Sequence, residues 1–152
     1  MSNPSTTLHE TEATLRSVIE NLIDGQQGFQ KIAEDLKDET LKRHFLAESL
    51  KRAEFRGELE TVLHQEGIHD IKESGTPSGA ILRVWAELKS KLGGGDHTLL
   101  VTAEQAEDEA KAAYRDALNK ELPFPVRQLL TTQSAHIQTS HDYVKAARDN
   151  SK

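Results

Sequence analysis

The sequence predicts an all-α fold, a four-helix bundle in which a long crossover joins the second and third helices. The first of three observations is a strict seven-residue spacing of apolar residues, at Leu8, Leu15, Leu22, Phe29 and Leu36. Such a spacing is typical of a helix that packs lengthwise on other helices. Three later segments carry similar stripes, and a connection too long for a hairpin turn separates the second stripe from the third. Bundles of this kind often hold metal ions between their helices.

The composition narrows the classes of protein that fit. The chain has 152 residues without a low-complexity tract, so we expect one domain over residues 1–152. It has no cysteine, which excludes thiolate metal sites and thiol catalysis. A formal net charge of −6, with both signs interspersed, argues against nucleic-acid binding and against a DNA-protecting shell. No apolar run approaches the roughly 20 residues that span a bilayer, so we expect no membrane insertion and a cytoplasmic location.

The first helix is expected over about residues 7–37, because Thr7 and Glu10 fit a capping box. Gly25 lies on its inward stripe, where glycine costs about 0.5–1 kcal/mol relative to alanine. A neighbouring helix that packs closely there is the explanation that we favour. Room for a ligand or for a bulky side chain opposite is the alternative.

The second helix is expected over about residues 39–66, with Asp38 as its N-cap and Gly67 as its stop. The short turn makes the first two helices antiparallel neighbours. Two charged residues, Glu48 and Arg52, interrupt the apolar stripe in the middle of this helix.

Residues 67–95 form the expected crossover. Thr76 followed by Pro77 predicts the start of a short helix over about residues 78–92. We expect Trp85 to anchor that helix on the bundle.

The third helix is expected over about residues 97–120, capped by Asp96, and its small, alanine-rich stripe indicates a well-buried helix. The prolines Pro123 and Pro125 mark the turn into the fourth helix, which is expected over about residues 124–149.

Polar residues lie on the inward face near the middle of every helix. Antiparallel pairing about the turn at residues 38–40 sets Gln26 near Arg52, and pairing about residues 121–122 sets Glu107 opposite His136 and Ala110 opposite Gln133. The sequence therefore predicts one polar layer across the bundle.

A di-iron or di-manganese bundle needs a Glu from each of two helices and a Glu-x-x-His from each of the other two. This chain departs from that pattern on three helices. The first helix has Gln26 and Gln27, the second has Lys51 in the histidine position, and the fourth has Gln133 in the carboxylate position. The candidate ligands that remain are Glu48, Glu104, Glu107 and His136.

Two interpretations of the layer follow. In the one that we favour, Arg52 pairs with Glu48 and Glu107, the layer holds no metal, and no cofactor is expected. In the other, the remaining ligands hold a single ion, iron or manganese. We expect His44, His64, His97 and Asp108 to lie on solvated faces.

Several short motifs, weak singly and specific as a set, suggest a family. They are Asp24–Phe29, Ala33–Asp35, Ser74–Lys89 around Trp85, Ala103–Asp108, Ala113-Tyr114 and His141-Asp142. Over roughly residues 15–149 the chain resembles a small, uncharacterised bacterial four-helix-bundle family, a domain of unknown function in the ferritin-like superfamily. The resemblance implies a ferritin-like fold and carries no established activity. Members of the family often have glutamates where this chain has Gln26 and Gln27, which further disfavours metal binding.

We therefore expect a non-catalytic, ferritin-like helical-bundle protein, for which a stress-related role is a hypothesis. The alternative is a metal-binding protein with weak iron oxidation or storage activity. A homodimer is a possible assembly, and the sequence does not identify another protein partner.

Overall fold

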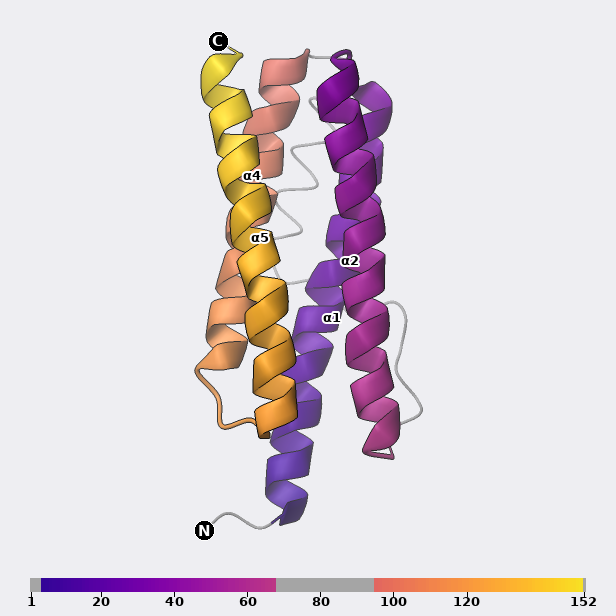
Figure 1. Cartoon of the computed structure of the whole chain (residues 1–152), viewed down its shortest axis with the longest axis vertical. Helices are drawn as coiled ribbons and strands as arrows, with labels where there is room; N and C mark the ends of the chain where they lie inside the picture. The colour runs from indigo at the N-terminus through magenta and orange to yellow at the C-terminus, as the bar shows by residue number, and fades with distance from the viewer. Residues whose placement is uncertain (1–3, 68–94, 152) are drawn as a thin grey trace.

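The computed structural model describes residues 4–67 and 95–151, and its secondary structure there is entirely α-helical. Four long helices pack as a bundle (Figure 1). This confirms the predicted all-α, four-helix class. The helix expected over residues 78–92, with Trp85, lies outside the described residues. The four helices are α1 (Pro4–Asp35), α2 (Glu39–Gln65), α4 (Asp96–Leu118) and α5 (Phe124–Asn150).

Helices α1 and α2 are antiparallel neighbours, as predicted. In Figure 1, α1 rises from the end marked N, α2 and α4 both descend, and α5 rises to the end marked C. Because α2 and α4 run the same way, they are not partners in an antiparallel hairpin. Helix α1 packs along α2, α4 packs along α5, and α1 also contacts α4, while α2 meets α5 over a short stretch.

Of the three caps expected at helix starts, the one at Asp38 is confirmed and those at Thr7 and Asp96 are wrong. Thr7 lies inside α1, which is already helical at Pro4, a residue that suits a first helical turn because it has no N–H to leave unpaired. At the start of α2, the Asp38 carboxylate accepts a hydrogen bond from the Leu41 N–H at 2.9 Å, as expected of an N-cap.

Asp96 does not cap its own helix, contrary to expectation. The residue before α4 is Gly95, whose φ of 95° lies in the left-handed region that favours glycine. The Asp96 carboxylate instead accepts hydrogen bonds from the backbone N–H groups of Lys37, at 2.8 Å, and Asp38, at 3.0 Å. This carboxylate thus joins the start of α4 to the turn between α1 and α2.

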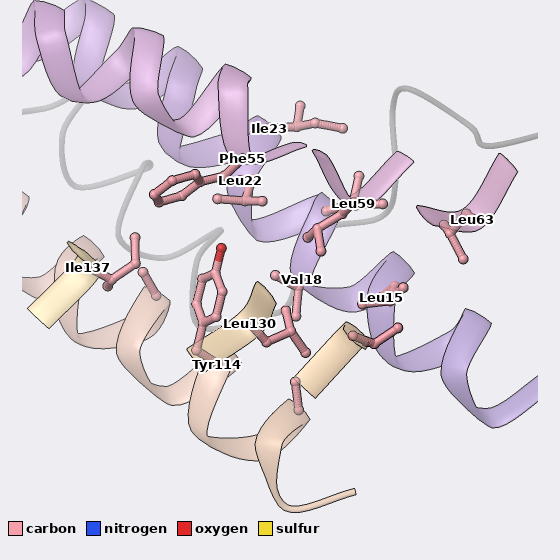
Figure 2. Close-up of a cluster of buried hydrophobic side chains, with 14 residues drawn as sticks. Leu15, Val18, Leu22, Ile23, Phe55, Leu59, Leu63, Tyr114, Leu130 and Ile137 are labelled. Atoms are coloured by element: carbon pink, nitrogen blue, oxygen red, sulfur yellow. The ribbon is translucent and has the colours of Figure 1, made fainter. Parts of the chain in front are cut away.

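The core consists of two apolar clusters, one toward each end of the bundle. The seven-residue stripe supplies Leu15, Leu22, Phe29 and Leu36, all at most 3% exposed, while the Leu8 side chain lies outside the described part. Figure 2 shows the first cluster, which gathers side chains from all four helices. The second cluster includes Phe29 and Leu36 from this stripe. The predicted polar layer lies between the two.

Gly25 faces the bulky side chain of Arg52. A bulky side chain opposite was part of the alternative explanation for a glycine at this position. A Cβ atom built on Gly25 would lie 3.8 Å from Cγ of Arg52 and 3.8 Å from the Phe29 ring. These are ordinary van der Waals distances, so the missing methyl group is not required by a steric clash.

We predict that Gly25→Ala stabilises the protein by about 0.5–1 kcal/mol in urea denaturation, because alanine costs less backbone entropy in a helix. The matched control is Gly57→Ala at an exposed position of α2, where a Cβ would meet nothing within 4 Å. If Gly57→Ala stabilises and Gly25→Ala destabilises, the packing of Arg52 requires the glycine and the prediction is wrong.

Candidate functional site

Arg52 lies at the centre of the polar layer. Its side chain is 1% exposed, and its Nη2 donates hydrogen bonds to the carboxylates of Glu107 and, at 3.3 Å, Glu48. Its guanidinium also lies over the Phe29 ring, 4.9 Å from the centroid. Glu48 is one helical turn away on α2, whereas Glu107 belongs to α4, so this ion pair joins the two helices that run in parallel.

The chain of charges continues from Glu48 toward the surface. Its second oxygen, Oε1, lies 2.7 Å from Nε2 of His136 on α5, and the His136 side chain is 33% exposed. The imidazole packs edge-on against Phe55. The polar layer therefore extends from the fully buried Glu107 through Arg52 and Glu48 to a partly exposed histidine.

Gln133 ties three helices together beside this chain of charges. Its Oε1 accepts a 2.8 Å hydrogen bond from the Tyr114 hydroxyl. Its Nε2 donates to the backbone oxygen of Phe55, at 3.3 Å, and to Glu58, at 3.1 Å. In Figure 2 the Tyr114 hydroxyl points from α4 toward Phe55. Because both ends of the Gln133 amide are engaged, this side chain acts as a hydrogen-bonding bridge.

Burial dominates the electrostatics of the layer. Burial raises the pKa of Glu107, and the positive charge of Arg52 opposes that shift. Burial also raises the pKa of Tyr114, so its hydroxyl stays a hydrogen-bond donor. Within the described part of the chain, Arg52 Nε has no hydrogen-bond partner. The charges are therefore paired in a buried part of the layer, where not every polar atom has a hydrogen-bond partner. Removing one member of the ion pair would lower the free energy of unfolding, because its partner would stay buried and uncompensated.

His44 does not lie on a solvated face, contrary to expectation. It lies half-buried between α2 and α5, stacked on Tyr143 with ring centroids 4.0 Å apart. Burial lowers the pKa of His44 below its ordinary value, and the negative charge of the nearby Glu48 carboxylate opposes that shift without cancelling it.

The candidate ligands separate into two groups. Glu48, Glu107 and His136 share one layer with Arg52 between the two carboxylates, whereas Glu104 lies outside that layer. Helix α1 contributes no carboxylate here, and the Gln26 backbone oxygen accepts a 2.9 Å hydrogen bond from Ser49.

Glu104 belongs to a second cluster, which the sequence analysis missed. It lies with Asp108 on α4 beside His141 on α5, and the Glu104 carboxylate pairs with Arg148. The spacing of four between Glu104 and Asp108 places them on one face of a helix. The antiparallel pairing that sets Glu107 opposite His136 also sets His141 within about one helical turn of Glu104 along the bundle. The sequence therefore contained the signal for this cluster.

Fold and site together define an all-α four-helix bundle with a buried ion-pair layer. A family model described as a domain of unknown function (DUF2383) matches residues 10–120, and the chain belongs to this family. The matched region covers α1 from residue 10 onward, together with α2 and α4, and ends before α5, the helix that supplies His136 and His141. No curated protein matches the chain. Among the described helices, none has the length and apolar character needed to cross a membrane.

We predict that Arg52→Leu destabilises the protein by about 3–5 kcal/mol, because it leaves Glu48 and Glu107 buried without their cation. The control is Arg56→Leu on the same helix. Arg56 pairs with Glu60 at 2.6 Å, and both side chains are more than one fifth exposed. It should cost less than about 1 kcal/mol in the same urea melts. Equal losses in the two variants would show that the central pair contributes no more than a surface pair.

A second carboxyl with a perturbed pKa lies on α1. Burial, helped by the negative charge of Glu20, raises the pKa of the half-buried Asp24 from 3.8 to about 6. The folded state therefore binds a proton more tightly than the unfolded state between these two values. Stability is lost as the pH rises through that window.

We predict that Asp24→Asn removes this loss. After allowing for solvent screening around a half-buried group, the variant should exceed the wild type by about 1 kcal/mol at neutral pH. The difference should vanish below pH 3.8. Urea melts across this pH range provide the measurement, and Glu20→Gln should reduce the pH dependence without abolishing it. A stability difference that does not change with pH would contradict the prediction.

Proposed function

We propose that this protein is a non-catalytic, ferritin-like helical bundle in which Arg52 takes the place of the metal ions that related architectures hold. The observation that carries the proposal is the Arg52 guanidinium, 1% exposed and bonded to both Glu48 and Glu107. Two antiparallel helix pairs, with α2 and α4 parallel, agree with a ferritin-like topology that has one crossover.

The arrangement of the other side chains supports a centre without metal. A metal ion between Glu48 and Glu107 would have to displace the guanidinium or lie against its positive charge, which is unfavourable in a low-dielectric interior. Gln133 is neutral, and its amide is already engaged at both ends. His136 directs Nε2 at Glu48, away from the most buried carboxylate.

These observations favour a structural or protein-binding role. The cytoplasmic location and the setting in bacterial stress physiology remain proposals that rest on the sequence alone. The expected homodimer remains a proposal as well. Helix α2 exposes Leu46 and Leu50, one turn apart, which offers an apolar contact for a second copy. Sedimentation equilibrium tests that proposal, and a monomer at all concentrations would contradict it.

The alternative is a metal-binding bundle with weak iron oxidation or storage activity. It is favoured by one fact, that Glu48, Glu107 and His136 do meet in a single layer. The two functions differ in whether iron can replace Arg52 as the partner of these carboxylates.

We predict that the protein does not accelerate oxidation of ferrous iron in air, followed by near-ultraviolet absorbance, because Arg52 occupies the position of the ions. The metal content of protein purified without chelators should likewise lack a di-iron stoichiometry. The control is Glu107→Ala, which should behave as the wild type does in this assay. Rapid, saturable oxidation at a di-iron stoichiometry, abolished by Glu107→Ala, would overturn the proposed function and establish the alternative.

A further inference from the structure

Three side chains of the kinds that bind metal ions converge where α4 packs on α5. They are Glu104, Asp108 and His141, and one ligand atom from each lies within 4.8 Å of the other two. His141 Nε2 is 2.9 Å from Asp108 Oδ1 and 3.8 Å from Glu104 Oε1. None of the three takes part in the ion-pair layer around Arg52.

The orientation of the imidazole distinguishes this cluster from ordinary surface charge. The His141 side chain is 9% exposed, and its other nitrogen, Nδ1, lies 3.1 Å from the Asp142 carboxylate. The same Asp142 oxygen accepts a 2.9 Å hydrogen bond from Gln138. Histidines that bind metals usually donate their second ring N–H to a carboxylate or carbonyl in this way, which fixes the tautomer and the ring.

That tautomer places three acceptor atoms together. In the tautomer that carries its proton on Nδ1, directed at Asp142, the lone pair of His141 Nε2 faces the oxygens of Glu104 and Asp108. Three electron-rich atoms at this separation need a positive charge between them. A second proton on the ring or a metal cation supplies it.

The charges around the cluster match a divalent cation. Glu104 and Asp108 bring two negative charges to the ligand atoms themselves. Behind them, Asp142 contributes one negative charge, and Arg148 pairs both with the other oxygen of Glu104 and, at 2.8 Å, with Asp149. The two carboxylates that supply ligand atoms would by themselves balance a dication, and Arg148 would hold Glu104 in a monodentate position.

We propose that Glu104, Asp108 and His141 bind one divalent transition-metal ion, with zinc as the best fit. One imidazole and two carboxylates suit zinc, whereas magnesium and calcium prefer oxygen ligands alone. Asp108 is 57% exposed, so water can reach the ion and complete its coordination. This site lies at the edge of the bundle and is compatible with a centre closed by Arg52.

Calorimetric titration of the full chain with zinc tests the proposal. We expect saturable binding of one ion per chain. Asp108→Asn and His141→Gln should each weaken the affinity at least about tenfold, and Asp142→Ala should weaken it by a similar factor because it removes the acceptor that orients the ring. Cobalt(II) offers a direct readout, since its visible absorption should change on binding to the wild type and not to His141→Gln. Asp108 is exposed enough that its variant should fold, which circular dichroism checks.

The matched control is His136→Gln in the central layer. Zinc binding that survives in His136→Gln and is weakened in Asp108→Asn supports the proposed site. Loss of binding in His136→Gln with full binding in Asp108→Asn would place the ion in the central layer. That result would overturn both this proposal and the proposed metal-free centre. Absence of saturable binding to the wild type would leave the cluster as an ion-pair network and would overturn this proposal alone.

Discussion

The pairing of one buried guanidinium is the constraint on which the bundle depends. Arg52 has almost no contact with water, so its charge must be matched within the protein. Glu48 is its partner one turn away on the same helix, and Glu107 reaches it from α4. The second bond can form only at one height and one rotation of α2 relative to α4. The ion pair therefore helps to define how the two helix pairs meet.

The apolar clusters toward the two ends provide the hydrophobic stabilisation that such a layer lacks. A buried ion pair is rarely more stabilising than apolar residues of the same volume, because desolvation offsets the attraction. We interpret the layer as a device for specificity. Apolar stripes could slide past one another by a turn, but a displaced Arg52 would be left without Glu107.

Helix α4 divides its carboxylates between two environments. Glu107 points to the bundle centre and is neutralised there by Arg52. Glu104 and Asp108 lie toward α5 and meet His141 near solvent. Residue types that bind metals thus occur both in a closed centre and at an open edge. Their neighbours distinguish the two: a fixed cation lies between the central carboxylates, whereas Nε2 of a buried histidine faces those at the edge.

The sequence by itself determined the four long helices, their order and the height of the polar layer, because apolar periodicity and turn signals are local properties of the chain. Pairing residues about the turns was sufficient to place Glu48, Arg52, Glu107 and His136 in one layer. The tertiary structure alone decided that Asp96 binds the turn before α2, that a bulky side chain covers Gly25, and that Asp108 meets His141. These contacts depend on how each helix is rotated about its axis. That rotation is set by the packing of all four helices together, which no single stretch of sequence encodes.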